Sequence, residues 1–405
     1  MQKNKLITIT LFLFFVFSSL LPSPALANPD LNAKAAILVD LRSGQILAGE
    51  NIHERRAPAS TTKILTAIIA LEKGRLDDIV TVSEKAAKME GTSIYLEKGE
   101  QLTLEELLYA MLLESANDAA VAIAEHLAGS EEEFAEWMNA KARELGARES
   151  HFANATGLPH PEHYTTAYDM AIIARYAMKN PLFASIVATK EKEINRQKKD
   201  GIRHLYNHNK LLWRYEGTTG IKTGYTTEAL QCLVASARRG EQHYLAVVLG
   251  SRGTIWNDAM KLLEYGFKNY REVQLLQKGE FVTTVTVRGG QVAQVNAVSG
   301  EDVYISLPRK EKKMPEKRIN LLSLKAPVKK GQVVGQVEYL YRGKVIATAD
   351  LMAQNAVALS PARKNARLLL LSSGVAGLFF SVSWLWRRRR KRRKVIFVKK
   401  YGSRI

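Results

Sequence analysis

The sequence predicts an α+β domain followed by a small all-β domain. An early β-hairpin within residues 35–48, a helical middle region and two late strands within residues 230–249 indicate one mixed or antiparallel sheet covered by helices. Beyond residue 270 the helical periodicity is absent, and short β-prone runs lie between turns. These runs are residues 281–287, 303–307 and 333–341.

The length and composition favour two folded domains in an otherwise ordinary globular chain. The chain has 405 residues, of which 46% are hydrophobic and 24% are charged. The predicted parts are a signal peptide at 1–27, the α+β domain at 28–270, the β-rich domain at 271–360, a linker at 361–367, a membrane segment at 368–386 and a basic tail at 387–405.

The N-terminus has the three regions of a secretory signal peptide. Lys3 and Lys5 form its basic region, residues 6–21 are its apolar region, and Ala25-Leu26-Ala27 forms a small-residue cleavage site. The mature chain is therefore expected to begin near Asn28, outside the cytoplasm.

The C-terminus has the features of a membrane anchor. Residues 368–386 carry no charge over about the length that crosses a bilayer, and Trp384 and Trp386 stand at their end, where aromatic rings favour the interface. Eight basic residues follow at 387–394, and such a flank stays cytoplasmic. The expected location is the cell membrane, with the folded domains extracytoplasmic and the C-terminus cytoplasmic.

The net charge of +19 comes mostly from the two ends of the chain. Residues 387–405 hold eleven Lys or Arg and residues 1–27 hold two, which leaves +6 for residues 28–386. This distribution argues against a nucleic-acid partner.

Cys232 is the single cysteine, so an intrachain disulfide is excluded, and its apolar neighbours predict a buried strand position.

The tetrapeptide Ser60-Thr61-Thr62-Lys63 stands at the start of a nearly all-apolar run, residues 64–71. Pro58 and Gly74 suit the start and the stop of a helix there, so Ser60 and Lys63 are expected on one face of its first turn. A lysine beside a buried helix loses solvation, which lowers its pKa. The neutral amine could take the proton of Ser60, which would then act as a nucleophile.

Two further motifs follow in order. Ser115-Ala116-Asn117 lies in a short link between two predicted helices, and Lys222-Thr223-Gly224 lies on a predicted strand. Ser60-x-x-Lys63 alone is a weak signal, but the ordered triple behind a signal peptide has the arrangement of the serine penicillin-recognising enzymes.

Each residue type in these motifs predicts a role. Ser115 offers a hydroxyl that relays a proton to the leaving amine, and Asn117 both donates to and accepts from an amide. Lys222 places a positive charge across the cleft, suited to a substrate carboxylate, and Thr223 adds a hydroxyl donor. Gly224 lets the substrate backbone approach the strand. The oxyanion hole should combine the N–H of Ser60 with that of Tyr225 or Thr226.

On these motifs, residues 30–360 resemble the low-molecular-mass penicillin-binding proteins that are D-alanyl-D-alanine carboxypeptidases. Residues 152–158 are similar to the family's Asn…Gly-Leu loop, and residues 207–226 to the segment that leads into the Lys-Thr-Gly strand. The resemblance implies a β-lactamase/transpeptidase-like catalytic domain, removal of the terminal D-alanine from the pentapeptide stem of peptidoglycan, and acylation by β-lactam antibiotics. No metal or organic cofactor is expected. Arg252 is the nearest match to a family arginine, but its spacing does not fit, so the predicted site omits it.

Three alternatives stay open. A DD-endopeptidase of peptidoglycan cross-links shares the same motifs. A serine β-lactamase does too, although no Glu-x-x-Leu-Asn lies between Asn117 and Lys222. A non-enzymatic membrane sensor would need a cytoplasmic effector, and only 19 residues follow Trp386.

Overall fold

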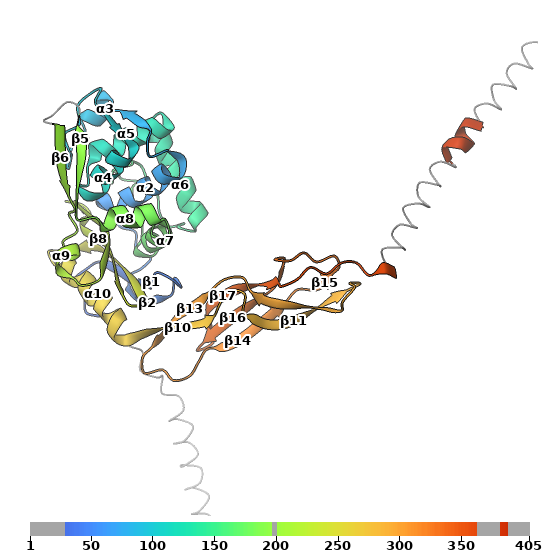
Figure 1. Cartoon of the computed structure of the whole chain (residues 1–405). Coiled ribbons are helices and arrows are strands. Elements are labelled where there is room, and N and C mark those ends of the chain that lie inside the picture. The colour runs from blue at the N-terminus through green and yellow to red at the C-terminus, as the bar shows by residue number, and fades with distance from the viewer. Residues whose placement is uncertain (1–28, 197–200, 363–380, 388–405) are drawn as a thin grey trace, which may run out of the picture. The chain divides into compact units, whose positions relative to one another are not determined.

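The computed structural model describes residues 29–196, 201–362 and 381–387. The chain forms two compact units (Figure 1). The first unit takes in the chain up to residue 273 together with residues 306–312, and the second takes in residues 274–305 and the chain from residue 313 onward. Each unit contains hydrophobic clusters of its own.

The first unit is built on a five-stranded sheet in which every neighbouring pair is antiparallel, in the order β2-β1-β9-β8-β7. The predicted hairpin forms β1 and β2, and the two predicted late strands form β8 and β9. β7 carries the Lys-Thr-Gly motif at one edge of this sheet. The strands are β1 (Ala35–Asp40), β2 (Ile46–Glu50), β7 (Thr218–Thr226), β8 (Leu230–Arg239) and β9 (Gln242–Ser251).

Helices cover both faces of this sheet, so its central strands are buried on both sides. α10 (Ile255–Asn269) packs on one face against β1, β8 and β9, and the other face carries α7, α8 and the helical region beyond them. The helices on that face are α2 (Lys63–Lys73), α3 (Glu84–Ala87), α4 (Leu104–Leu113), α5 (Asn117–Ala128), α6 (Glu131–Leu145), α7 (Ala167–Ala177) and α8 (Pro181–Ala188). The short helix α9 (Leu211–Arg214) packs on the same face as α10.

The helix boundaries follow local signals in the sequence. Thr103 and Glu106 form the predicted capping box at the start of α4. Gly129 ends α5 with a φ of 84°, a left-handed conformation that glycine adopts without steric cost. The helix predicted at 131–145 is observed with those bounds as α6.

Other elements differ from the prediction. Residues 80–101, expected to be irregular, contain α3 and contribute to a small hairpin of β3 (Ile79–Thr81) and β4 (Gln101–Thr103). α8 was not predicted from its short apolar run. By contrast, β5 (Glu191–Arg196) and β6 (Gly201–Tyr206) pair apart from the main sheet, in agreement with the loop or edge hairpin that the polar stretch 190–203 indicates.

The second unit is β-rich, as the alternation of its sequence predicts. Its main sheet has the order β14-β16-β17-β12-β11-β15, and β10 pairs separately with β13. The described stretch 271–360 contains no helix. The strands of its main sheet are β11 (Phe281–Arg288), β12 (Gln294–Ser299), β14 (Glu316–Leu321), β15 (Leu324–Lys325), β16 (Val333–Tyr341) and β17 (Lys344–Ala353). β10 (Tyr270–Leu276) and β13 (Val303–Pro308) each include residues of both units.

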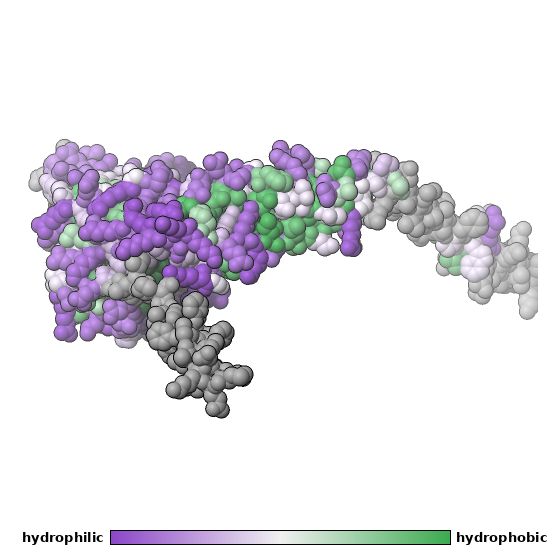
Figure 2. Space-filling view, turned by 90° about the horizontal axis from the view of Figure 1, so that it is seen from below, coloured by the Kyte–Doolittle hydropathy of each residue, from purple (hydrophilic) through white to green (hydrophobic). Residues whose placement is uncertain are grey.

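The surfaces of the two units differ in hydropathy. On the face seen in Figure 2 the β-rich unit shows hydrophobic residues in green, whereas the helical unit is mostly hydrophilic. Large apolar side chains of the β-rich unit that are exposed to solvent include Phe281, Leu321, Leu322, Val333 and Val345.

The predicted targeting segments lie mostly outside the described residues. This holds for the signal peptide at 1–27, for residues 368–380 of the membrane segment and for most of the basic tail. Residues 381–387 are helical. Within the described part of the chain, no helix has the length and apolar character needed to cross a bilayer.

Candidate active site

Ser60 and Lys63 meet at the junction of a 3₁₀ turn and α2. The sequence places both residues in one α-helix, whereas Ser60 lies in the 3₁₀ turn Ala59–Thr62 and α2 begins at Lys63. Side chains three residues apart eclipse one another in a 3₁₀ turn. The Nζ atom of Lys63 consequently lies 2.9 Å from Ser60 Oγ.

The amine of Lys63 is fully buried among three oxygen atoms. Besides Ser60 Oγ it lies 2.7 Å from Asn117 Oδ1 and 2.6 Å from the Thr156 carbonyl oxygen. Burial lowers the pKa of Lys63 well below its ordinary value, and the charge of Lys222 lowers it further, against a smaller opposing effect of Asp118 and Glu131. In its neutral form this amine has two N–H donors and one lone pair. The amide and carbonyl oxygens only accept and can take both donors, which would leave the lone pair for the Ser60 hydroxyl.

Asn117 is held by the loop that precedes α4. Its Nδ2 donates to the Glu90 carbonyl at 2.6 Å and its backbone N–H donates to the Thr92 carbonyl at 2.7 Å. The next residue, Asp118, accepts from the backbone N–H of Leu96 at 2.9 Å. These contacts fix the orientation of the Asn117 amide, with its oxygen toward Lys63.

Ser115 occupies a strained turn between α4 and α5. It is buried and has a φ of 64°, in the left-handed region that serine rarely adopts. It lines a cavity of about 250 Å³ together with Ser60, Thr223, Gly224 and Tyr225. The turn thus brings a second hydroxyl to the same cavity as the first.

The strand β7 closes this cavity with the Lys-Thr-Gly motif. Lys222 is 1% exposed, and burial lowers its pKa to about 7, against an opposing effect of Glu114. At Gly224 a Cβ atom would lie 2.8 Å from the backbone nitrogen of Ser60. Only a residue without a side chain lets β7 approach the turn of Ser60 this closely.

The structure brings the predicted site residues together from three regions of the chain. Four of them line the cavity, namely Ser60, Ser115, Thr223 and Gly224. Lys63 contacts Ser60 and Asn117, and Lys222 acts electrostatically on Lys63. The predicted residues are Ser60, Lys63, Ser115, Asn117, Lys222, Thr223 and Gly224. Arg252, which the predicted site omits, is exposed in the turn after β9.

The sequence motifs do not indicate a role for the Thr156 carbonyl. Asn154 Oδ1 accepts from the backbone N–H groups of Thr156 at 3.2 Å and Gly157 at 2.7 Å, which shapes the loop that presents this carbonyl to Lys63. The signal was present as the Asn…Gly-Leu pattern at 152–158. Sequence reasoning likewise gave no role to Glu114 and His208.

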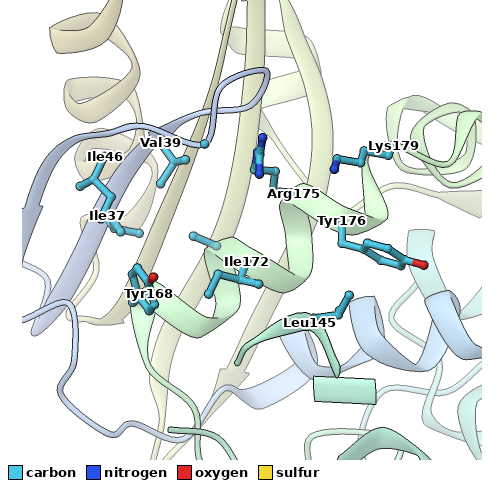
Figure 3. Close-up of a pocket in the computed structure, with 11 residues that line it drawn as sticks. Ile37, Val39, Ile46, Leu145, Tyr168, Ile172, Arg175, Tyr176 and Lys179 are labelled. Carbon is cyan, nitrogen blue, oxygen red and sulfur yellow. The ribbon is translucent and has the colours of Figure 1, made fainter. Parts of the chain in front are cut away.

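A larger cavity lies at the opposite edge of the sheet, along β1 and β2. It has a volume of about 310 Å³ and its lining includes Ile37, Ile172, Arg175 and Lys179 (Figure 3). None of the predicted site residues lines it, so size does not identify the reactive cavity. Among the described residues, no group of three or more His, Cys, Asp or Glu side chains could hold a metal ion.

A serine hydroxyl, a buried amine and a cationic strand around one cavity define a serine acyl-transfer enzyme. Comparison with known proteins specifies the class. The family described as D-alanyl-D-alanine carboxypeptidase, peptidase S11, matches residues 23–253, and the C-terminal domain of penicillin-binding protein 5 matches residues 270–359.

Full-length relatives agree with these matches. D-alanyl-D-alanine carboxypeptidase DacF of Bacillus subtilis (strain 168) is 39% identical over 332 residues, which cover 80% of this chain and 85% of the relative. DacA of Escherichia coli (strain K12), with the same description, is 34% identical and covers 80% and 83%. The structure of penicillin-binding protein 5 from Haemophilus influenzae superimposes with a TM-score of 0.72 at 31% identity, covering 82% of this chain and 99% of that one.

The chain belongs to the D-alanyl-D-alanine carboxypeptidases of peptidase family S11. It is a serine D-Ala-D-Ala carboxypeptidase of peptidoglycan and a penicillin-binding protein. The predicted resemblance and enzyme class are confirmed. The α+β domain followed by a β-rich domain is confirmed as well.

Proposed function

We propose that Ser60 is the nucleophile of this carboxypeptidase and that Lys63 is its general base. The 2.9 Å contact between Lys63 Nζ and Ser60 Oγ carries the proposal. The other two partners of the amine accept hydrogen bonds only, so its lone pair is directed at the serine proton.

Acylation then proceeds in one addition and one elimination. Ser60 Oγ attacks the carbonyl carbon of the penultimate D-alanine and gives its proton to Lys63. The oxyanion is stabilised by the N–H of Ser60 and that of Tyr225 or Thr226. Ser115 relays a proton to the amine of the terminal D-alanine as the C–N bond breaks, which leaves the peptide as an ester on Ser60.

Deacylation uses the same groups with water as the nucleophile. Water attacks the ester carbonyl and loses a proton to the base, and the C–O bond to Ser60 breaks as Ser60 regains a proton. The products are the shortened peptide acid and free enzyme. A β-lactam would form the same ester on Ser60, with its cleaved amide still attached to the acyl group.

The strand β7 and Asn117 are proposed to bind the substrate. Lys222 and Thr223 would hold the terminal carboxylate through charge and a hydroxyl donor. Asn117 donates one Nδ2–H to Glu90 and accepts from Lys63, which leaves one N–H for a substrate amide. Asn117 therefore serves both Lys63 and the substrate.

A β-lactamase would need a free carboxylate to activate the water that removes the acyl group quickly. The two carboxylates whose charges act on Lys63 are both engaged elsewhere. Asp118 accepts from the loop of Leu96, while Glu131 accepts from the backbone of Ala155 and pairs with Lys85 at 3.1 Å. This supports the carboxypeptidase over the β-lactamase.

We also propose that the enzyme is anchored in the cell membrane by residues 368–386, with both folded units extracytoplasmic. The signal peptide and the basic flank predict this topology independently. The expected result is that the full chain sediments with membranes and that a chain ending at residue 360 is released. Sedimentation of both chains alike would contradict the anchor.

The central test is the replacement of Ser60 by alanine. Ser60→Ala should abolish both covalent labelling by penicillin and release of D-alanine from a pentapeptide, and peptide mapping of the labelled native enzyme should find the acyl group on Ser60. Ser185→Ala, at an exposed serine of α8, is the matched control and should keep both activities. D-alanine release by Ser60→Ala would overturn the assignment of Ser60 as the nucleophile.

Incubation with a cross-linked peptide dimer tests the endopeptidase activity.

A further inference from the structure

Glu114 and His208 lie beside the reactive cavity and have no part in the chemistry above. Glu114 is the residue directly before Ser115, at the end of α4. His208 lines the same cavity as Ser60 and Ser115, and it is the one histidine among the described residues that line it. Their position raises the question of what they contribute to this site.

Three contacts attach the segment between β6 and α9 to the end of α4. The Nε2 atom of His208 lies 3.2 Å from Glu114 Oε2, and Glu114 Oε1 accepts from the Tyr206 backbone N–H at 2.7 Å. The backbone N–H of His208 also donates to the Leu113 carbonyl at 3.2 Å. Since Ser115 follows with a φ of 64°, these contacts brace the strained turn from its N-terminal side.

His208 also lines the cavity beside Thr223 of β7, and the charge of the neighbouring Lys222 acts on it. The charged groups that act on His208 are Lys222 on β7 and Glu114 on α4. Burial, followed by the charge of Lys222, lowers the pKa of His208, which favours its uncharged imidazole. Glu114 is the one carboxylate that opposes the effect of burial on the pKa of Lys222. It therefore favours the charged form of Lys222.

We propose that Glu114 and His208 form a positioning pair that holds the turn of Ser115 and keeps Lys222 charged for a substrate carboxylate. Glu114 supplies the negative charge that a buried ammonium needs. His208 donates a hydrogen bond that holds this carboxylate in place, because an ionised carboxylate only accepts. The proposal deepens the proposed function and rests on its assignment of Lys222 to the terminal carboxylate.

Glu114→Gln tests the charge with little change of shape. The glutamine keeps an oxygen for the Tyr206 N–H but removes the negative charge. Without it Lys222 should lose its proton at lower pH, so the alkaline limb of kcat/KM for a D-Ala-D-Ala peptide should move to lower pH. At pH 8 kcat/KM of the variant should be roughly 3- to 10-fold below that of the native enzyme, as one unit of pKa corresponds to tenfold in proton affinity. At pH 6 the two enzymes should have nearly the same kcat/KM.

The control substrate is the same peptide ending in D-alaninamide, which has no carboxylate for Lys222. Glu114→Gln should lower kcat/KM for this peptide much less than for the acid. Glu105→Gln, at the first turn of the same helix, is the control variant and should leave both profiles unchanged. An unmoved alkaline limb, or equal losses for both peptides, would overturn the charge role of Glu114.

His208 variants test the positioning part. His208→Gln retains a side-chain N–H for Glu114 and should keep kcat within about twofold, whereas His208→Leu removes the donor and should lower kcat by roughly 3- to 10-fold, the usual value of one hydrogen bond. Equal kcat for both variants would contradict the hydrogen-bond role.

Lys222→Gln separates this proposal from the proposed function. It should lower kcat/KM for the acid peptide far more than for the amide. If it lowers both equally, the assignment of Lys222 to the carboxylate is wrong. If it lowers the acid selectively and Glu114→Gln does not, only the positioning pair is wrong.

Discussion

Lys63 illustrates how burial changes the chemistry of a single residue. An exposed lysine is an ammonium ion at neutral pH and offers no lone pair. At this site burial and the nearby charge of Lys222 lower its pKa, and two of its three oxygen partners can only accept hydrogen bonds. These surroundings disfavour the extra proton, which supports the proposed role of Lys63 as a base.

Lys63→Ala should lower the rate of acylation by penicillin roughly 10²- to 10⁴-fold, the usual contribution of a general base. Lys63→Arg should be no better, because a guanidinium stays protonated and has no basic lone pair at physiological pH. In the native enzyme kcat/KM should fall as the pH drops and Lys63 takes up a proton. Stopped-flow acylation of the three proteins across pH measures these effects, and a fast Lys63→Arg variant would contradict the role of base.

At the scale of elements, the site depends on how closely β7 approaches the 3₁₀ turn of Ser60. A Cβ atom added at Gly224 would lie 2.8 Å from Ser60 N and 3.0 Å from Ala59 Cβ. These are backbone and near-backbone atoms that cannot rotate away. The strand and the turn would have to separate to admit any side chain.

Gly224→Val should therefore abolish penicillin labelling while the protein stays folded. Gly129→Asn is the matched control, because a Cβ atom at Gly129 would meet no other atom within 4 Å and asparagine tolerates its left-handed conformation. Labelling with a fluorescent penicillin and circular dichroism measure the two properties. Native labelling by Gly224→Val would show that the close approach is not needed.

A buried ion pair joins the hairpin of β5 and β6 to the loop before α4. Arg196 of β5 and Glu100 are 1% and 0% exposed, and they contact one another at 2.6 Å. Arg196 also donates to the carbonyls of Ile94 at 2.7 Å and Tyr95 at 3.0 Å. This loop also holds Asn117, so the ion pair supports the site from a distance.

Glu100→Gln should destabilise the first unit by about 3–5 kcal/mol, because it leaves the charge of Arg196 buried without its partner. The double variant Glu100→Gln with Arg196→Met should recover part of the loss. Glu84→Gln, which breaks ion pairs on the surface, is the control and should change the free energy of unfolding little. Urea unfolding of the four proteins measures their free energies of unfolding. A Glu100→Gln variant as stable as the native protein would contradict the structural role of the pair.

At the scale of the whole molecule, the chain has separate hydrophobic cores for its two units. Two clusters lie on the opposite faces of the five-stranded sheet, and a third lies among the strands of the β-rich unit. The third includes Val285, Val337 and Leu351. Separate cores allow one unit to lose stability while the other keeps its own.

Leu351→Ala should destabilise the β-rich unit by about 2–5 kcal/mol, since this side chain is fully buried. Calorimetry should show one shifted transition and one unchanged transition, and penicillin labelling should persist at temperatures where the β-rich unit has unfolded. A single shifted transition with loss of labelling would show that the two units unfold together.

Much of this architecture is predictable from local patterns. The hairpin of β1 and β2, the capped helix α4 and the strand β16 follow from periodicity and capping residues that act within a few positions. The short helix α8 and the strands β3 and β4 were missed, because tertiary packing rather than intrinsic propensity stabilises such short elements.

The sequence by itself determined the class of enzyme, because three motifs in a fixed order have the residue types expected for a nucleophile, a base and a cationic strand. Only the tertiary structure decided the 3₁₀ conformation at Ser60, the Thr156 carbonyl beside Lys63, and the proximity of Glu114 and His208 to Lys222. These features depend on distances between residues far apart in the chain. Such distances follow from packing of the whole unit, and no local pattern encodes them.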